Sequence, residues 1–244
     1  MLEGLFSAAA GMNAQQEELD AIGNDLANVN TTGYKAQRTA FSDLLYNQVE
    51  DAGTNTTAGA GARESSIGRV ETQGSMKETG NPLDLAIVGD GYFVVTLPGG
   101  KSALTRDGSF GVDASGTLTN SSGYRLSPRI QVPKGVAEQE VRVADDGTVS
   151  AAGKRLGKLS LVTVDSPAHL LSDGGNLFNV TEASGAAHAA RDATIQAGSL
   201  EESNVDMSRE LTALVTTQRA FQMTSTAVQN ESQMMAIANQ LRPA

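Results

Sequence analysis

Apolar residues recur at seven-residue intervals near the N-terminal end of the chain. One series is Leu5, Met12, Leu19 and Leu26, and a second series, three residues further on, is Ala8, Ile22 and Val29, with Gln15 in the remaining place. This a and d heptad spacing is typical of a helix that buries one stripe against another helix. It predicts a helix over residues 3–29, which Gly11 and Gly23 weaken by about 1 kcal/mol each relative to Ala.

The C-terminal end repeats the spacing. Its first series is Met207, Leu214, Phe221, Val228 and Met235, and four residues after the first four of these come Leu211, Gln218, Ser225 and Ser232. One series is apolar and the other is mostly polar. The pattern predicts a helix over residues 204–241 that Pro243 stops. Ser203, with Asp206 three residues later, predicts a capping box at its start.

The two stripes need partners. They could be core-facing helices of one globular domain, but no other segment of the chain has a helical pattern. We therefore expect the terminal helices to pair with each other, with copies of themselves, or with both. The predicted assembly interface consists of large apolar heptad residues: Leu5, Met12, Leu19, Ile22, Leu26, Val29, Leu211, Leu214, Phe221, Val228 and Met235. Because the polar second series makes this pairing weak in an isolated chain, we expect the two ends to be partly disordered until assembly.

The middle of the chain has the pattern of β-structure. Two apolar runs, 85–88 and 92–95, flank Gly89-Asp90-Gly91, which predicts a hairpin. Further short runs separated by turn residues follow at 104–106, 109–112, 116–119, 124–126, 140–143, 148–150 and 158–164. They predict an antiparallel sheet or small barrel over residues 82–198.

The predicted fold class is α+β, with long N- and C-terminal helices in a coiled-coil-like pair and an antiparallel β-domain inserted between them. The predicted segments are an N-terminal assembly helix (1–35), a connecting segment (36–81), the β-domain (82–198) and a C-terminal assembly helix (199–244). Within the connecting segment, residues 46–68 are rich in Gly, Ala, Thr and Asn. We expect that stretch to be extended or flexible.

Composition narrows the possible functions. The net charge is -10 and no Lys/Arg cluster occurs, so we expect no nucleic-acid partner. The chain has no Cys, which excludes disulfides and thiolate metal sites. The first residues lack the basic and apolar regions of a secretory signal, and no run of about 20 apolar residues could span a bilayer.

The residue types that carry enzyme chemistry are sparse. His169 and His188 are the only histidines, and no G-x-S-x-G, H-E-x-x-H or Walker A pattern occurs. Asp145-Asp146-Gly147 lacks the alternating acids and distal Glu of a calcium loop, so a turn is expected there. The sequence therefore predicts no enzyme activity, cofactor, metal or small-molecule substrate.

Several motifs resemble those of one protein family. Residues 27–35 (ANVNTTGYK) resemble the N-terminal signature of bacterial flagellar rod, hook and hook-associated axial proteins. Residues 83–93 and 105–110 resemble the central motifs of that family, and residues 198–206 (GSLEESNVD) and 218–221 (QRAF) resemble its C-terminal motifs. The motif residues singled out are Asn28, Asn30, Thr32, Gly33, Tyr34, Ser203, Asn204, Val205, Gln218 and Arg219. The resemblance covers nearly the whole chain in the family's order.

This resemblance implies a structural subunit of the flagellar basal-body rod that self-assembles into a helical tube through its terminal helices. The implied partners are copies of itself, other rod and hook subunits, the ring proteins that act as a bushing, and the flagellar export apparatus. The implied location is the periplasm-spanning rod, reached by type III export without a cleaved signal peptide. Within the family, the length fits a rod subunit better than the longer hook protein. The stretches at 10–16 and 218–221 resemble the distal rod type more than the proximal ones, and a proximal rod subunit or hook-basal body paralogue remains the alternative.

Two other functional classes fit the sequence less well. A peptidoglycan hydrolase would need paired carboxylates in a cleft, whereas the acids here are expected in turns and on helix faces. A surface adhesin with a coiled-coil stalk would explain the architecture but not the motifs at both ends.

Gly33, four residues after Val29, is expected to take a left-handed conformation that ends the first helix, with Asn28 and Asn30 bonding backbone groups nearby.

Overall fold

The computed structural model describes residues 2–43, 47–51, 54–58 and 62–240. The chain forms two compact units. The first, called here the helical unit, comprises residues 1–27, 37–68 and 206–244; the second, the β unit, comprises residues 28–36 and 69–205.

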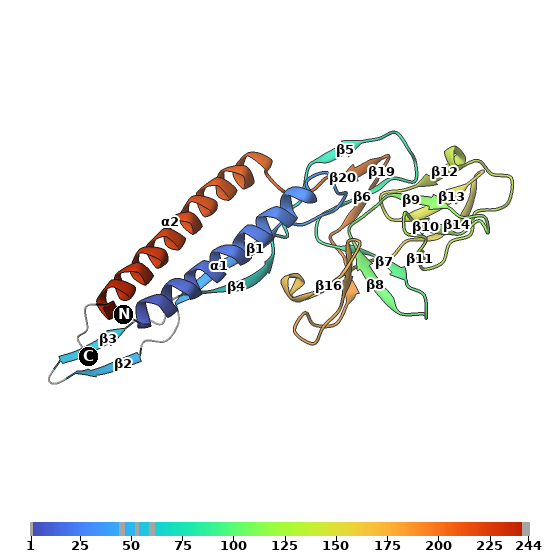
Figure 1. Ribbon diagram of the computed structural model, residues 1–244. Helices are drawn as coiled ribbons and strands as arrows, with labels where there is room; N and C mark the ends of the chain where they lie inside the picture. Colours follow the sequence, from blue (N-terminus) through green and yellow to red (C-terminus); the bar gives the residue numbers. More distant parts are fainter. Residues whose placement is uncertain (1, 44–46, 52–53, 59–61, 241–244) are drawn as a thin grey trace. The chain divides into compact units, whose positions relative to one another are not determined.

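The helical unit is built on two long helices. Helix α1 spans Leu2–Ala27 and helix α2 spans Met207–Gln240. They lie side by side and run in opposite directions (Figure 1). The predicted fold class, a pair of terminal helices with an inserted antiparallel β-domain, is therefore confirmed. No helix within the described residues is long and apolar enough to cross a membrane.

The ends of the helices differ from the prediction. The carboxylate of Asp206 accepts hydrogen bonds from the backbone N–H groups of Ser208 (3.0 Å) and Arg209 (3.2 Å), so Asp206 is the N-cap of α2. The predicted capping box was wrong, because the Ser203 hydroxyl instead accepts the backbone N–H of Val205 at 3.3 Å. Helix α1 ends at Ala27, and Val29 lies in the following turn rather than in the helix.

Four strands complete the helical unit. Strand β1 (Gln37–Asp43) pairs with β4 (Ala62–Arg69), and β2 (Asn47–Asp51) pairs antiparallel with β3 (Thr54–Ala58). This pairing was not predicted, because runs such as Thr54–Ala58 lack alternating apolar residues. Within the stretch 46–68, expected to be extended or flexible, residues 46, 52–53 and 59–61 lie outside the described residues.

The β unit contains a nine-stranded sheet with the order β16-β17-β8-β7-β11-β10-β9, to which β15 adds on β7 and β18 adds on β15. Its pairings are antiparallel. The strands are β7 (Tyr92–Thr96), β8 (Ser102–Thr105), β9 (Phe110–Val112), β10 (Leu118–Asn120), β11 (Arg125–Ser127), β15 (Leu161–Thr163), β16 (Leu171–Gly174), β17 (Leu177–Asn179) and β18 (His188–Ala189).

Smaller sheets flank it. Strands β12 (Val141–Val143), β13 (Thr148–Ala151) and β14 (Lys154–Lys158) form one, β6 (Leu85–Val88) pairs with β19 (Thr194–Ala197), and β5 (Met76–Glu78) pairs with β20 (Ser199–Glu201). Two short 3-10 turns lie at Glu138–Glu140 and Pro167–His169. The terminal motif 198–206 thus begins with a strand of this unit.

The predicted hairpin between residues 85–88 and 92–95 was wrong. Strand β6 pairs with β19, with Ile87 opposite Ile195, while β7 pairs with β8, β11 and β15. Gly89 has a φ of +95°, and a side chain on it would meet the backbone oxygen of Asp192 at 3.2 Å. The Gly-Asp-Gly link therefore carries the chain from one sheet to another instead of closing a two-stranded turn.

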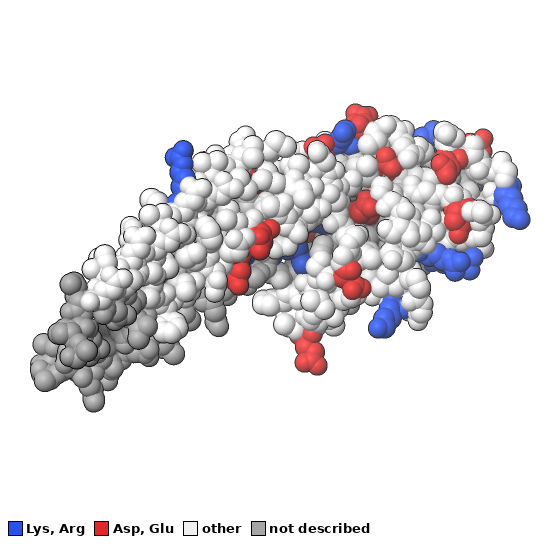
Figure 2. Space-filling view, in the orientation of Figure 1, with Lys and Arg blue, Asp and Glu red and all other residues white. Residues whose placement is uncertain are grey.

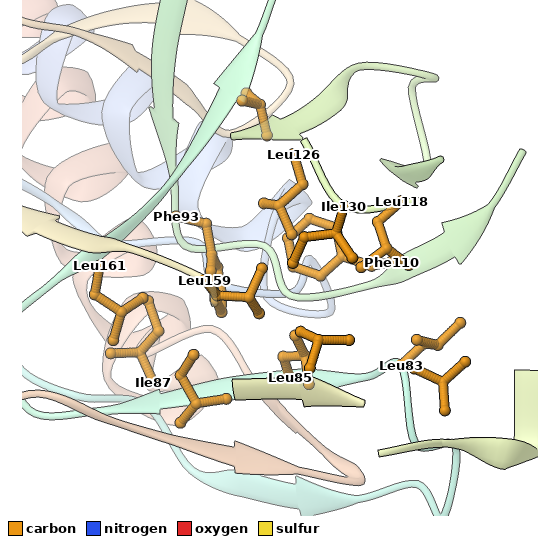
Figure 3. Packing of buried hydrophobic residues seen from close by; sticks show 14 of the residues in the cluster. Leu83, Leu85, Ile87, Phe93, Phe110, Leu118, Leu126, Ile130, Leu159 and Leu161 are labelled. Carbon is orange, nitrogen blue, oxygen red and sulfur yellow. The ribbon is translucent and has the colours of Figure 1, made fainter. Parts of the chain in front are cut away.

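The core of the β unit lies between these sheets. Leu85, Ile87, Phe93 and Phe110 are buried there with aliphatic residues of the later strands (Figure 3). The rings of Phe93 and Phe110 meet edge to face, with centroids 5.0 Å apart. Figure 3 shows side chains from strands far apart in sequence converging on one cluster, so this unit has a hydrophobic core of its own.

Candidate functional site

The predicted assembly residues fall into different environments. On α1, Ile22 is buried and Leu5, Met12, Leu19 and Leu26 are half-buried; on α2, Leu214, Phe221 and Val228 are half-buried and Leu211 is exposed. Val29 lies outside the helix, and the side chain of Met235 lies outside the described residues. Most of the described heptad residues are therefore partly covered within one chain.

The contact between α1 and α2 is polar as well as apolar. Ala14 and Ile22 of α1 and Thr217 of α2 are buried, and the Thr217 hydroxyl donates to the Glu18 carboxylate at 3.1 Å. Beside them is an open hollow of about 380 Å³ lined by Gly11, Ala14, Gln15, Glu18, Phe41, Thr216, Thr217 and Ala220. Because small and polar residues replace large apolar ones here, the pair is less tightly packed than an all-leucine seam.

Two acids lie at the other end of this contact. Asp25 is buried and its carboxylate accepts the backbone N–H of Gln37 at 3.2 Å to each oxygen. Burial, reinforced by the charge of Asp25, raises the pKa of the Glu210 carboxyl on α2. The ionised form of Glu210 is therefore disfavoured in the folded chain.

Part of α2 presents large apolar residues to solvent. The exposed ones are Met207, Leu211, Val215, Met223, Met234 and Ile237, with exposed fractions from 44% to 68%. On α1 the Phe6 side chain is 72% exposed. Residues of this size are usually covered, so the exposed face of α2 has the composition of an interface.

The motifs of the two chain ends meet in the β unit at a buried ion cluster. The Glu201 carboxylate accepts the Lys35 ammonium at 2.6 Å on one oxygen and the Arg106 guanidinium at 3.1 Å on the other. All three side chains are at most 3% exposed. Gly74 donates its backbone N–H to the same carboxylate at 3.0 Å. One buried acid thus joins the N-terminal, central and C-terminal motifs.

The two cations of this cluster make further bonds. Lys35 also donates to the carbonyl oxygen of Thr72 (2.8 Å), and Arg106 donates to those of Ile87 (3.4 Å) and Gly89 (2.9 Å). Burial lowers the pKa of the Lys35 ammonium, and its hydrogen bond to Glu201 acts in the opposite direction. The cluster is therefore stable only because nearly every buried charge has a partner.

A second layer surrounds Arg106. Its guanidinium lies 5.6 Å from the ring centroid of Tyr92, whose hydroxyl donates to the Glu71 carboxylate at 2.8 Å. Burial, together with the charge of Glu71, raises the pKa of the Tyr92 phenol. Arg69 pairs with Glu71 at 3.6 Å and stacks over the Phe178 ring at 4.2 Å. These contacts extend the cluster to the second hydrophobic group of the β unit.

Asn204 clamps the segments beside the cluster. Its side-chain oxygen accepts the backbone N–H of Ala36 at 2.7 Å, and its amide donates to the carbonyls of Val70 (2.7 Å) and Thr72 (2.9 Å). Its backbone N–H reaches the Tyr34 carbonyl at 3.4 Å. Three segments that connect the β unit to the rest of the chain, near residues 36, 70 and 204, are therefore held together at one point.

Gly33 is required by close packing. Its φ is +67°, and a Cβ atom there would come within 2.6 Å of the Arg106 carbonyl group. The predicted left-handed conformation is confirmed, but its role is different: α1 has already ended at Ala27, and Gly33 lets the chain pass against the Arg106 backbone. The Gly33 N–H donates to the Glu201 carbonyl at 2.8 Å.

The remaining motif residues divide between the units. Asn28 closes the turn after α1, accepting the backbone N–H of Thr31 (3.0 Å), and the Thr32 carbonyl accepts the Asn176 amide (2.6 Å). Asn30 is exposed, and Ser203 and Val205 lie in the link before α2. Gln218 and Arg219 are exposed on α2, away from the cluster.

Sequence reasoning did not assign roles to Lys35, Arg106 and Glu201. Each lay within a motif, but Lys35 and Glu201 are 166 positions apart and no local pattern links them. A Lys or Glu side chain is usually solvated, so only the fold identifies the pair as buried. In the part of the chain that the structure describes, no group of His, Asp and Glu is arranged to hold a metal ion.

Three family models match parts of the chain. Residues 5–35 match a model described as flagella basal body rod protein, residues 86–151 one described as flagellar hook protein FlgE/F/G D1 domain, and residues 196–241 one described as flagellar basal body rod FlgEFG protein C-terminal. The first and last matches include the two motifs that meet at Glu201.

Curated relatives match over the full length. The flagellar basal-body rod protein FlgG of Borreliella burgdorferi is 36% identical over 263 residues, covering 99% of both chains. The FlgG protein of Caulobacter vibrioides is 36% identical over 263 residues, covering 99% of this chain and all of the relative. The hook-basal body complex protein FlhP of Bacillus subtilis is 29% identical over 271 residues. The chain therefore belongs to the flagellar basal-body rod protein family and is a structural subunit of the rod.

Proposed function

We propose that this chain polymerises through α1 and α2 into the tubular distal rod of the flagellum. In this arrangement the helical unit forms the wall of the tube, and neighbouring rod and hook subunits continue it at either end. The proposal includes export through the flagellar type III pathway and a ring-protein bushing around the finished rod. Its role is mechanical rather than catalytic.

The observation that carries the proposal is the exposed apolar face of α2. Leu211, Val215, Met223, Met234 and Ile237 are between 44% and 68% exposed in the single chain. Burying such side chains contributes about 25 cal/mol for each Å² removed from water. Association between copies would therefore be favoured by burying side chains that remain exposed in the isolated chain.

The loose contact between α1 and α2 supports the same proposal. The buried residues at this contact include Ala14, Ile22, Asp25 and Thr217, and Ile22 is the only large apolar residue of these four. A helix pair held this weakly gains much of its order from further contacts. We expect the amides of both helices to exchange quickly in the dilute monomer and to be protected in the polymer.

A second candidate is a proximal rod subunit or hook-basal body paralogue. The similarity to FlhP, a protein named for the hook-basal body complex, favours this alternative. Its identity of 29% is lower than the 36% found for the two FlgG proteins above, so the distal type is preferred.

The proposal is tested by placing a charge in the helix contact. Phe221 of α2 is half-buried, so Phe221→Asp brings a carboxylate into a partly apolar environment. We expect this variant to stay monomeric in sedimentation velocity and to form no filaments in electron micrographs, while its β unit unfolds at the wild-type urea concentration.

A matched control is Val180→Asp in the β unit, where Val180 is 44% exposed. It adds the same charge at an exposed apolar position outside both helices, and we expect it to polymerise normally. Normal polymerisation of Phe221→Asp would contradict the role given to the helix contact.

A further inference from the structure

The outer sides of the two helices of the helical unit carry charges of opposite sign. Helix α1 contains five acidic residues and no Lys or Arg. Glu18 and Asp25 are used within the chain, by the Thr217 hydroxyl and the Gln37 backbone. Glu17 and Asp20 are exposed, three positions apart, and therefore lie on one side of the helix. This outer side of α1 is acidic.

Phe6 lies on the same side. It precedes Glu17 by eleven positions, which is close to three full turns at 3.6 residues per turn. Its ring is 72% exposed, the largest exposed fraction among the large hydrophobic side chains of the described residues. The outer face of α1, defined here by Phe6, Glu17 and Asp20, thus combines one large apolar side chain with two negative charges.

The outer face of α2 has the opposite charge. Val215, Arg219 and Met223 are spaced by four positions and form one stripe along the helix. Val215 is 44% and Met223 68% exposed, and Arg219 between them is exposed as well. Among the described residues, Arg219 has no acidic partner within ion-pair distance. This face offers apolar surface around a single unpaired cation.

Few other charges interfere. Figure 2 shows that the surface over α1 and α2 is mostly uncharged in that view, whereas charged residues are scattered over the β unit. On α2 the charged residues are Arg209, Glu210, Arg219 and Glu231. Isolated charges on an otherwise neutral surface can set which faces meet and in which register, because each mismatch is costly.

We propose that the outer face of α1 in one copy binds the outer face of α2 in the next copy. Arg219 pairs with Glu17 and Asp20 across this contact, and Val215 and Met223 flank that pair with apolar surface. Phe6 lies about 17 Å or more along α1 from the two acids, at 1.5 Å per residue, so it contacts α2 beyond the Val215–Met223 stripe. This inference rests on the proposed function, since it assigns the faces through which the copies polymerise.

The contact joins two different faces, and this determines the kind of assembly. Like faces repel, because α1 against α1 would bring acids together and α2 against α2 would bring Arg219 against its own copy. A contact between unlike faces is heterologous, and it generates an open helical polymer when the rotation does not close. The charge pattern therefore favours a filament over a closed dimer.

The test reverses the charges separately and together. Arg219→Glu places an acid opposite the acidic face of α1, and the double substitution Glu17→Lys with Asp20→Lys places cations opposite Arg219. We expect each change to raise the critical concentration for polymerisation about tenfold or more, because like charges across an interface are strongly unfavourable. Sedimentation of the polymer from purified full-length chain measures this concentration.

The decisive test is whether exchanging the charges between the two faces restores polymerisation. The triple variant Arg219→Glu, Glu17→Lys, Asp20→Lys has the charges exchanged between the two faces, and we expect it to polymerise near the wild-type critical concentration. Mixing the two defective variants should also restore polymer, since each supplies the face that the other lacks. Arg142→Glu is the control, because Arg142 is exposed in the β unit and the charge change is the same.

The outcomes are distinguishable. Wild-type polymerisation of Arg219→Glu, or failure of the triple variant to polymerise when circular dichroism shows its helices intact, would overturn the pairing of these faces and leave the proposed function standing. If the wild-type chain does not polymerise at any concentration, the proposed function itself fails and this inference fails with it.

Discussion

Replacing Glu201 by Gln tests whether the junction of the two terminal motifs is held by charge. The Glu201 carboxylate pairs with Lys35 at 2.6 Å and with Arg106 at 3.1 Å, and all three side chains are at most 3% exposed. Gln is nearly the same size, but it is neutral. It also carries an N–H₂ group that would face one of the two cations, which can only donate hydrogen bonds.

The size of the effect follows from this geometry. Removing one partner of a buried ion pair destabilises a protein by about 3–5 kcal/mol, because the remaining charge stays buried without compensation. In a domain of about 150–250 residues, each kcal/mol of unfolding free energy that is lost lowers the melting temperature by about 2–4 °C. We therefore expect Glu201→Gln to lower the melting temperature of the β unit by roughly 6–20 °C.

The pH dependence gives a second signature of the same change. A lysine whose pKa is lower in the folded than in the unfolded chain releases a proton on folding, so the unfolding free energy rises with pH in that range. Without Glu201, the charged form of the buried Lys35 loses its ion pair, which disfavours that form further. The loss of unfolding free energy caused by Glu201→Gln should therefore become smaller as pH rises from neutrality towards 10.5, the ordinary pKa of Lys.

The assay is thermal unfolding, repeated in urea to give the unfolding free energy, and both are followed by tyrosine fluorescence. Three of the four tyrosines, Tyr34, Tyr92 and Tyr124, lie in the β unit. The control is Glu202→Gln in the next position, where the carboxylate is 49% exposed and lies 3.8 Å from Lys77. An exposed pair of this kind contributes below about 1 kcal/mol. Equal losses for the two variants would refute the account of the buried cluster.

Two further predictions concern the core and the helix contact. A Cβ atom on Gly108 would come within 1.7 Å of the Leu85 carbonyl oxygen, so Gly108→Ala should lower the unfolding free energy by about 1–3 kcal/mol or more. Gly111 has open space around it, so Gly111→Ala should be neutral or slightly stabilising. Urea unfolding measures both variants, and equal effects would contradict the close approach at Gly108. The pKa of Glu210 is raised by burial and by Asp25, so folding is penalised by the ionised carboxylate above the ordinary pKa of 4.5. Glu210→Gln should therefore increase the helicity and melting temperature of the helical unit at pH 7 but not at pH 4, as followed by circular dichroism. An equal gain at both pH values would be inconsistent with this linkage.

The helices could be predicted because their pattern is local. The seven-residue spacing of Leu214, Phe221 and Val228 fixes a helix whatever lies beside it, and these residues do occupy partly buried positions on α2. What the spacing does not give is which neighbour covers each residue. Leu211 belongs to the same heptad pattern but is 48% exposed, because the contact with α1 covers only one side of α2.

The β unit shows where local patterns fail. The individual strands around residues 85–95 were predicted, but their partners were not, since β6 pairs with a strand more than one hundred positions away. The ion cluster depends on the same distant pairings. Lys35, Arg106 and Glu201 are polar residues in three separate motifs, and only the completed fold removes them from water.

Electron microscopy of the purified chain tests the central claim, that the terminal helices are the assembly element. The full-length chain is compared with one lacking residues 2–27 and 207–240, the two helices themselves. The account predicts regular tubes or filaments from the full-length chain alone, and a folded monomer from the shortened chain, since the β unit keeps its own core. Filaments from the shortened chain, or a full-length chain that stays monomeric with protected helix amides, would contradict it.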